Sequence, residues 1–575
     1  MLTMKRMIAE AIVEKMSAVS SELSVTDVER MLEYPPDAKM GDLALPCFKL
    51  SKILRNAPVK IAAELAEGFS VPCVDRAEAV NGYLNIFLSP EYLAGTVLSE
   101  VLAKGERYGA PDLGKGKTVV LDYSSPNVAK PFHIGHLGTT VIGHSLKKLH
   151  EFAGYKCVGI NYLGDWGTQF GKLIVAFKKW GNREAVEAGG IDALVELYVR
   201  INNAISGNEA EGILANPALA DESRAEFLKM EQGDEENLAL WRWFVDLSVA
   251  EYKKTYNQLG IEFDSYKGES FYTDKMPAEV QKLRDAGLLK IDDGASIVDL
   301  EAYGMPPCLI LKRDGSTLYP TRDIAAAVYR KNTYDFDKAI YVTSAGQSLH
   351  FAQWFKVVEL MGYDFADKLV HVPYGTVSIN GAKLATRTGN VILLRDLFAL
   401  AIEKVSAIME EKNPNLADKE KIAESVGVGA IVFYYLSNNR IRDINFVMED
   451  ALSFDGNTGP YVQYTYARTC SVLSKADFDP TAPMAITAPE EAELLRILSR
   501  FEETVREAID AYEPSVITRY ILDVAGAFNR FYHNCTILGA EDGAVKNTRL
   551  ALTSAAKTVL GNAFELICLA KTEKI

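Results

Sequence analysis

Two short apolar runs flank a long amphipathic stretch, and together they predict a unit of strand, helix and strand. The first run, KTVVLD at 117–122, ends in the turn residues SSPN, and the second, KCVGINYL, occupies 156–163. Between them, apolar residues recur along one helical face from Ile134 to Phe152, and Gly154 suits the position just after a helix end. Such a βαβ unit implies a parallel sheet with a crevice at the carboxyl ends of its strands.

Further units of the same kind follow along the chain. The run AIYVTSAGQ at 339–347 leads into a helix that is predicted to end near Gly362. The run LVHVPYGTVS at 369–378 leads into a polar loop and then a helix from about Asp396. We therefore expect more strands in the same parallel sheet.

The pattern changes twice, which predicts three domains. Residues 1–110 alternate helical stretches with short apolar segments and indicate an α+β module. Residues 111–440 carry the βαβ units, with an acidic, helical insertion at about 182–262. From about residue 420 the spacing is helical and no further strands are expected, so 441–575 is predicted to be an all-α domain. The expected fold class is multidomain α/β, with a Rossmann-like parallel sheet in the middle domain.

Composition excludes several classes of protein. A chain of 575 residues is too long for one ordinary core, and no run of about 20 apolar residues indicates a membrane span. Seven cysteines are scattered without a CxxC pair, which argues against a zinc site or a disulfide framework and favours the cytoplasm. The net charge of −15 argues against a general affinity for nucleic acid, although a local basic face remains compatible with it.

The segment SSPNVAKPFHIGH at 124–136 carries the most informative chemistry. His133 and His136 stand three residues apart at a predicted helix start, where free N–H groups and the helix dipole favour phosphate. Gly135 leaves room for a flat group such as a purine, and Lys130 adds a cation. Such a corner suits a nucleotide whose phosphorus is attacked. The four letters alone are equally typical of a capped helix start with surface histidines.

The surrounding sequence decides between these interpretations. HIGH after a first strand resembles the class I aminoacyl-tRNA synthetases, and the wider sequence closely resembles the arginyl-tRNA synthetases. The segments that carry this resemblance are SSPNVAKPFHIGHLGTT (124–140), GINYLGDWGTQFG (159–171), FDSYKGESFY (263–272), LYPTRDIAAA (318–327), IYVTSAGQSLH (340–350) and LSFDGNTGPYVQYTYAR (452–468). The resemblance extends to the N-terminal module, as that family's additional domain contacting the tRNA elbow, and to the helical C-terminus, as its anticodon-binding bundle.

The resemblance implies an arginine pocket and an ATP site. The positions that match the family's arginine-binding residues are Asp122, Asn127, Tyr319, Asp323 and Gln347. Acidic and amide groups are the partners that a planar guanidinium prefers. The family commonly has a glutamate where Asp122 stands, which sets that carboxylate one methylene further back. For ATP the resemblance implies His133, Gly135 and His136, with His350 in the same crevice or, equally, in the core.

A second family motif, the mobile lysine-rich loop that clamps pyrophosphate, is altered here. The matching stretch at 380–390 reads NGAKLATRTGN, and Thr388 stands where family members often have a lysine. Lys383 and Arg387 remain as candidate catalytic cations. We expect Lys130 to supply part of the lost stabilisation.

Aromatic residues interleave with arginines in the C-terminal domain. They are Tyr461, Tyr464, Tyr466, Phe528, Phe531 and Tyr532, with Arg468 and Arg530. Such rings either stack on the bases of an anticodon or form the core of a helical bundle. The sequence leaves both interpretations open.

The function expected from the resemblance is that of an arginine–tRNA ligase. ATP and L-arginine would give arginyl-adenylate, and the arginyl group would pass to the terminal ribose of tRNA(Arg). Mg²⁺ would accompany ATP, with no protein-bound zinc or other protein metal site, and the enzyme would be a cytoplasmic monomer whose activation step depends on tRNA. Two alternatives remain, a class I ligase for another amino acid and a non-catalytic tRNA-binding relative.

Overall fold

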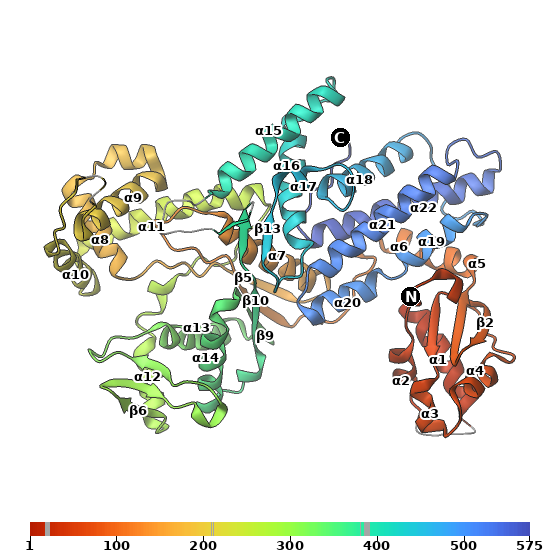
Figure 1. Ribbon diagram of the computed structural model, residues 1–575, viewed down its shortest axis with the longest axis horizontal. Helices are drawn as coiled ribbons and strands as arrows, with labels where there is room; N and C mark the ends of the chain where they lie inside the picture. Colours follow the sequence, from red (N-terminus) through yellow and green to blue (C-terminus); the bar gives the residue numbers. More distant parts are fainter. Residues whose placement is uncertain (18–22, 209, 211, 380, 384–391) are drawn as a thin grey trace. The chain divides into compact units, whose positions relative to one another are not determined.

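The computed structural model describes residues 1–17, 23–208, 210, 212–379, 381–383 and 392–575. The chain divides into two units (Figure 1). Unit 1 contains Met1–Pro111, Phe454–Ala511 and Val516–Ile575, and unit 2 contains Asp112–Ser453 and Tyr512–Ser515. The two ends of the chain therefore fold together, whereas the central segment forms a unit of its own.

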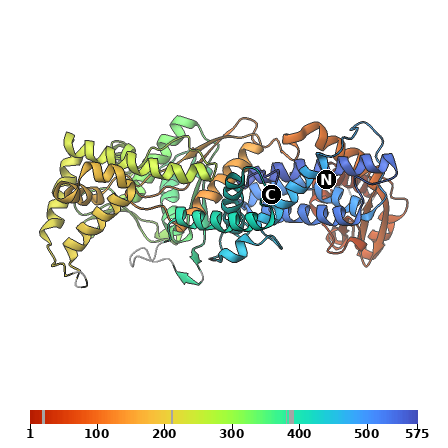
Figure 2. The same ribbon diagram turned by 90° about the horizontal axis from the view of Figure 1, so that it is seen from above.

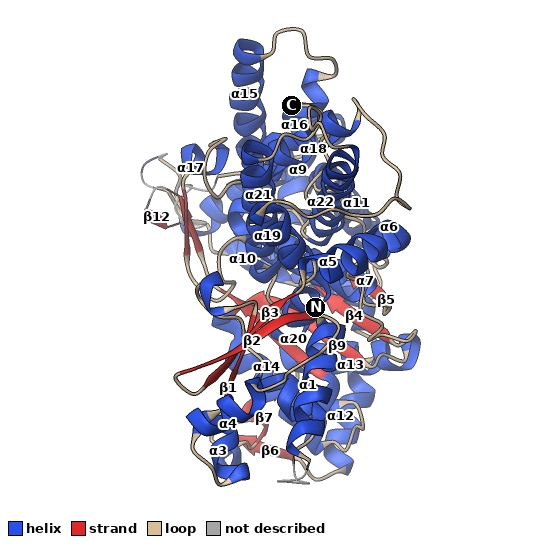
Figure 3. Ribbon diagram, turned by 90° about the vertical axis from the view of Figure 1, so that its right-hand side faces the viewer, coloured by secondary structure: helices blue, strands red, loops and turns tan. Residues whose placement is uncertain are grey.

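The N-terminal part of unit 1 is a three-stranded antiparallel sheet with helices (Figure 3). Its central strand is β3 (Tyr83–Leu88), which pairs with β1 (Leu43–Pro46) and β2 (Val74–Val80). Leu84, Ile86 and Leu88 alternate along β3 and are buried, as expected where one face of a strand covers a core. The other elements are α1 (Leu2–Met16), α2 (Val25–Met31), η1 (Ala38–Met40), α3 (Phe48–Leu54), α4 (Pro58–Ala66), α5 (Pro90–Leu93), η2 (Ala94–Leu98), α6 (Ser99–Lys104) and η3 (Gly105–Arg107).

The C-terminal part of unit 1 is helical, as the sequence predicted. Phe528, Phe531 and Tyr466 are buried, so these rings belong to the core of the helices. Tyr464 and Tyr532 are exposed, and the Arg468 guanidinium lies 5.1 Å and 4.8 Å from their ring centres. The helices are α18 (Gly459–Leu473), α19 (Pro489–Leu498), α20 (Phe501–Ala511), α21 (Ser515–Asn534) and α22 (Gly543–Leu566).

A four-stranded parallel sheet forms the centre of unit 2, in the order β10-β9-β4-β5. Its strands are β4 (Thr118–Asp122), β5 (Lys156–Ile160), β9 (Lys338–Ser344) and β10 (Leu369–Tyr374). The predicted crossover helix is present as a short turn, η4 (Ile134–His136), followed by α7 (Leu137–Phe152). Gly154 has φ +84° just after α7, which confirms its predicted place at the helix end. Gly143 lets α7 pack closely against Tyr123, the residue after β4, because a Cβ at position 143 would lie 2.3 Å from the Tyr123 side chain.

Further helices flank the sheet and share a hydrophobic core with its strands. Trp354 and Phe336 are fully buried in this core together with Val120 of β4. The elements are η6 (Glu269–Tyr272), α12 (Met276–Asp285), β6 (Leu289–Asp292), β7 (Ala295–Val298), η7 (Glu301–Tyr303), β8 (Cys308–Leu311), α13 (Tyr319–Tyr334), η8 (Ala345–Gln347), α14 (Ser348–Leu360), η9 (Ala366–Lys368), α15 (Leu394–Lys412), α16 (Lys419–Leu436) and α17 (Met448–Leu452).

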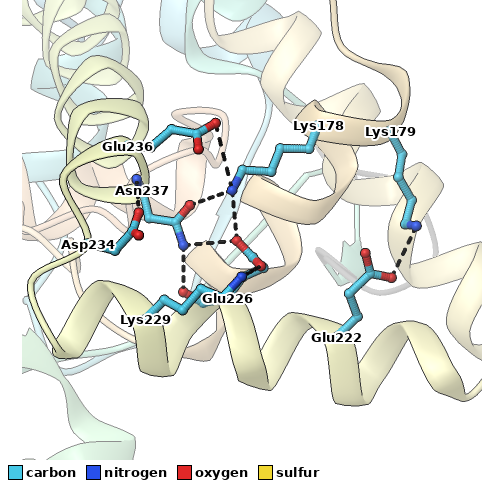
Figure 4. A network of polar contacts seen from close by, with 8 residues as sticks. All are labelled: Lys178, Lys179, Glu222, Glu226, Lys229, Asp234, Glu236 and Asn237. Atoms are coloured by element: carbon cyan, nitrogen blue, oxygen red, sulfur yellow. Dashed lines mark hydrogen bonds and ion pairs between the residues drawn. The ribbon is translucent and has the colours of Figure 1, made fainter.

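The predicted insertion is helical throughout its described elements. α8 (Thr168–Trp180), α9 (Arg183–Ser206), α10 (Ala218–Glu231) and α11 (Glu235–Gln258) pack together (Figures 1 and 2). Glu226 of α10 accepts hydrogen bonds from Lys178 of α8 at 2.8 Å and from the Asn237 amide of α11 at 2.9 Å (Figure 4). Burial acts to raise the pKa of Glu226, but these bonds and one from Lys229 lower it to about 2.

Two sequence expectations about strands were wrong. The run at 369–378 is not one strand but two, because β10 ends at Tyr374 and β11 (Val377–Ile379) begins in another sheet. Gly375 lies between the two strands and lets the backbone of residue 442 approach closely, since a Cβ there would lie 2.4 Å from the Arg442 carbonyl oxygen. A strand also occurs beyond residue 420, because β13 (Ile444–Phe446) pairs with β11, which also pairs with β12 (Ala382–Lys383). Three residues are too short a run for hydrophobic periodicity to reveal.

No helix in the described ranges is both long and apolar enough to span a membrane. The seven cysteines all carry free thiols.

Candidate active site

A cleft of about 610 Å³ opens at the carboxyl ends of β4, β9 and β10, where the βαβ pattern predicted a crevice. Parallel strands end at the same edge of their sheet, so residues that are distant in sequence meet there. The cleft wall contains seven of the predicted site residues, namely Asp122, Asn127, His136, Tyr319, Asp323, Gln347 and His350. The sequence thus identified residues that the fold does bring together.

The two histidines of the HIGH motif hold each other in a fixed arrangement. The His133 N–H donates to His136 Nδ1 at 3.2 Å, and the Gly135 N–H donates to His133 Nδ1 at 3.1 Å. The two ring centres are 3.9 Å apart, and His136 also stacks on Phe132 at 5.1 Å. Each Nδ1 accepts a hydrogen bond, so the proton of each neutral ring lies on Nε2. Both rings therefore present an Nε2–H donor.

Burial keeps both rings uncharged at neutral pH. It lowers the pKa of His133, and the charge of Lys130 acts in the same direction. Burial lowers the pKa of His136 to about 3, with further contributions from His133 and Lys130. The pair can therefore donate hydrogen bonds to phosphate oxygens without a positive charge of its own.

Gly135 has a different structural role from the one expected. A Cβ at this position would lie 2.8 Å from Cε1 and 2.9 Å from Nδ1 of His133. The space that the missing side chain leaves is therefore occupied by the His133 ring, not kept open for a base. Gly135 allows this ring to fold back over the Gly135 N–H.

The HIGH corner, residues 132–136, also forms backbone hydrogen bonds with one flank of the altered loop. The Ile134 N–H donates to the Ile392 carbonyl at 3.3 Å, and the Leu394 N–H donates to the Phe132 carbonyl at 2.9 Å. On the other flank the Lys383 backbone pairs with Ser378. Residues 384–391, which include the candidate cation Arg387 and also Thr388, lie outside the described residues, as does residue 380.

Asp122 lines the cleft, but its carboxylate already has partners. Arg330 Nη1 lies 2.7 Å from Oδ2, and the Ser125 hydroxyl donates to Oδ1 at 2.9 Å. Burial raises the pKa of Asp122, and the charge of Arg330 opposes that rise. Arg330 is itself only 1% exposed, and its guanidinium faces the rings of Tyr162 and Tyr341 at 5.1 Å and 5.7 Å. A guanidinium of the protein thus occupies the position that we expected the substrate to take at Asp122.

Asp323 and Tyr319 lie one turn apart at the start of α13, as the sequence predicted. Asp323 Oδ2 accepts a hydrogen bond from His350 Nε2 at 2.7 Å. Tyr319 is 65% exposed, so its ring is available at the cleft mouth. His350 therefore lies next to an acidic group of the proposed arginine pocket, whereas we had assigned it to ATP.

Sequence reasoning missed a third acidic group in the cleft, Glu269. It follows Gly268, where a Cβ would lie 2.5 Å from the Asp165 carboxyl carbon, and it pairs with Arg322 at 2.8 Å. Burial raises the pKa of Glu269 to about 7, helped by Asp323 and opposed by Arg322. The segment KGESFY belongs to the family pattern, but nothing in its spacing shows that the glutamate is half-buried against α13. The other lining residues that the sequence did not indicate are Ser124, Ser125, Thr139, Tyr162, Gly164, Tyr341, Val342, Thr343, Ser344, Phe351 and Tyr374.

Three family models match successive parts of the chain. "tRNA synthetases class I (R), catalytic domain" matches residues 97–448, "Arginyl tRNA synthetase N terminal domain" matches 3–88, and "DALR anticodon binding domain" matches 462–575. The chain belongs to the arginyl-tRNA synthetase family. The enzyme is thus a class I aminoacyl-tRNA ligase, specifically an arginine–tRNA ligase, and neither alternative from the sequence is supported.

Close relatives cover nearly the whole chain. A protein named arginine–tRNA ligase from Alkaliphilus metalliredigens is 49% identical over 567 residues, which are 96% of this chain and 99% of the relative. Another of that name, from Clostridioides difficile, is 50% identical over 558 residues, 96% of this chain and 97% of the relative. The solved arginyl-tRNA synthetase of Thermus thermophilus superimposes with a TM-score of 0.83 at 26% identity, over 99% of this chain and all of that one.

Proposed function

We propose that the cleft of unit 2 binds L-arginine and ATP together. The arginine carboxylate attacks the α-phosphorus of ATP, the bond to the β,γ-pyrophosphate breaks, and arginyl-adenylate remains in the cleft. The arginyl group then passes to a hydroxyl of the terminal ribose of tRNA(Arg), and AMP leaves. The observation that carries this proposal is that His136 and the polar set around Asp323 line one cleft at the strand ends.

The arginine end of the cleft is its acidic end. We assign the substrate guanidinium to Asp323 and Glu269, with Tyr319 against its plane, because paired donors suit carboxylates held in place by other groups. Asn127 and Gln347 offer amide groups to the α-amine and carboxylate. Asp122 contributes here by holding Arg330, which fixes the wall of the pocket.

The phosphate end is formed by the HIGH corner. The Nε2–H groups of His133 and His136 donate to phosphate oxygens of ATP, and Lys130 supplies a mobile positive charge. Lys383 and Arg387 are proposed to approach the pyrophosphate from the altered loop. Among the described residues, no group of three or more His, Cys, Asp or Glu side chains could hold a metal ion. Mg²⁺ would therefore bind mainly through the ATP phosphates and water, with its charge offsetting theirs.

We assign the tRNA contacts to unit 1. The exposed rings of Tyr464 and Tyr532 lie on either side of the half-buried Arg468 guanidinium, and stacking on such rings is how proteins hold unpaired bases. The N-terminal module is assigned to the tRNA elbow. The seven free thiols fit a reducing compartment, so we place the enzyme in the cytoplasm, and we expect it to be a monomer.

Amino-acid-dependent exchange between ATP and pyrophosphate tests the activation step. We expect exchange with L-arginine, with little or none from the other amino acids, and a strong increase when tRNA(Arg) is added. Exchange driven by another amino acid, or none at all with arginine and tRNA(Arg), would contradict the assignment.

Lys130 offers a first quantitative test of the phosphate end. Lys130→Ala is expected to lower the turnover rate of exchange roughly 10- to 100-fold, because one cation near the transferring phosphoryl group is lost. The control is Lys290→Ala, which removes an exposed lysine of β6 that pairs with Asp299. An unchanged turnover rate for Lys130→Ala rules out its proposed role.

Glu269 predicts a pH dependence of arginine binding. Its pKa of about 7 lies above the ordinary carboxyl value, so the group gains a proton as the pH falls from 8 to 6. A cationic guanidinium binds the ionised carboxylate better, so KM for arginine should rise by up to about tenfold per pH unit below 7. Glu269→Gln should raise KM at pH 8 and flatten this profile. A wild-type KM that is constant from pH 6 to 8 would count against the assignment.

A further inference from the structure

The loop that joins β4 to the HIGH corner has an unusual backbone. Ser124, Ser125 and Ala129 adopt φ values of +71°, +42° and +58°, although none of them is glycine. Residues other than glycine rarely adopt this left-handed backbone conformation, and they keep it only where surrounding contacts stabilise it. The same loop carries Asn127 and Lys130, which we assign to arginine and to ATP. Something must therefore hold this conformation in place.

One face of α11, a helix of the insertion, makes these contacts. Ser248, Tyr252 and Tyr256 follow one another at intervals of four residues, which places them in one row along the helix. All three are buried. The Ala129 N–H donates to the Ser248 hydroxyl at 3.1 Å, and the Tyr256 hydroxyl lies 2.8 Å from that of Ser124. The row therefore contacts two of the three residues with positive φ.

Tyr252 makes the contact closest to the chemistry. Its hydroxyl lies 2.7 Å and 2.8 Å from the carbonyl oxygens of Asn127 and Lys130, so its one proton is shared between the two acceptors. One O–H group thus closes the turn between the two proposed substrate residues and fixes the distance between them. The ring packs on Phe132 at 5.6 Å, next to the HIGH pair.

We infer that the insertion positions the catalytic loop, and that Tyr252 is the positioning residue that sets Asn127 and Lys130 relative to each other. This inference rests on the roles proposed above for Asn127 and Lys130. The insertion thereby gains a function in the activation step, although none of its described residues lines the cleft. Small displacements of substrate-positioning groups are known to cost up to about a hundredfold in rate.

Steady-state exchange kinetics of Tyr252→Phe, which removes only the hydroxyl, test the inference. We expect kcat to fall about tenfold and KM to rise a few-fold for both arginine and ATP, because one hydroxyl holds residues for both substrates. The matched control is Tyr363→Phe, whose hydroxyl bonds Glu279 and Lys282 elsewhere in unit 2. Ser248→Ala is a second variant. It should lower kcat less than Tyr252→Phe does, and it should change KM for arginine and KM for ATP by similar factors. If Tyr252→Phe folds poorly, Ser248→Ala becomes the test. Unchanged kcat and KM values in Ser248→Ala would then overturn the inference.

Two reference variants separate this inference from the proposed function. Asn127→Ala should raise mainly KM for arginine, and Lys130→Ala should lower mainly kcat. If both leave the kinetics unchanged, the proposed function fails at these residues, whatever Tyr252→Phe does. If both have these effects and Tyr252→Phe only lowers the melting temperature, the positioning role is wrong. In the double variant Tyr252→Phe with Lys130→Ala, we expect a fall in kcat smaller than the product of the two single effects.

Discussion

Asp323→Asn is expected to lower kcat/KM for arginine in the exchange reaction by roughly 10²- to 10³-fold, with KM for ATP little changed. The substitution keeps the shape of the side chain but removes the charge that we propose faces the substrate guanidinium in the cleft. Losing one partner of such a charged pair costs about 3 to 4 kcal/mol, and each 1.4 kcal/mol is a factor of ten. The amide also offers a poorer acceptor to His350, which now holds the carboxylate at 2.7 Å.

The same helix provides the control for Asp323. Asp335 lies at the C-terminal end of α13, with φ +44° and a bond from Lys331. Asparagine tolerates this backbone conformation well, so Asp335→Asn should leave the kinetics and the fold unchanged. An Asp323→Asn enzyme with the kcat/KM of the wild type would show that the guanidinium lies elsewhere.

His136→Ala is expected to lower kcat for exchange by about 10²- to 10³-fold, with a much smaller change in KM for arginine. His136 lines the cleft and carries its proton on Nε2, and removing one donor that stabilises a developing negative charge typically costs this much. The ring also orders the corner through the His133 N–H, so circular dichroism should accompany the kinetics to show that the fold persists.

The pH dependence distinguishes an uncharged donor from a charged one. The pKa of His136, lowered to about 3 by burial, lies far below the working range, so the ring is neutral from pH 6 to 8. After correction for Glu269, for example in the Glu269→Gln background, kcat should show no step attributable to a histidine in this range. A fall in kcat as a group with a pKa between 6 and 7 is deprotonated would mean that the charged ring is the active form.

The sequence predicted the central sheet from local hydrophobic patterns, and the resemblance to the family indicated the candidate residues that line the cleft. The βαβ unit appears in hydrophobic periodicity, and the cleft residues lie in motifs directly after strands, as Asn127 and Gln347 do. The side-chain partners of the acidic cleft residues could not be predicted from the sequence. Asp122 pairs with Arg330 and Asp323 with His350 through packing between α13 and its neighbours, and no pattern along one strand reveals such contacts.

The role of the insertion was hidden for a similar reason. Its acidic, helical sequence suggested no chemistry, because the functional feature is a row of hydroxyls whose partners lie more than a hundred residues away, such as Tyr252 and Asn127. Gly135 is the opposite case. The sequence indicated this residue as part of the site, but the space beside it is filled by the His133 ring and not left for a purine. There the constraint comes from the neighbouring His133 ring.

The most direct test is a crystal structure of the enzyme with a non-hydrolysable arginyl-adenylate analogue. We predict that the guanidinium lies within hydrogen-bonding distance of Asp323 and that the phosphate group lies against the HIGH corner, within reach of His136. A guanidinium bound away from Asp323, or a phosphate that contacts neither histidine, would contradict the account.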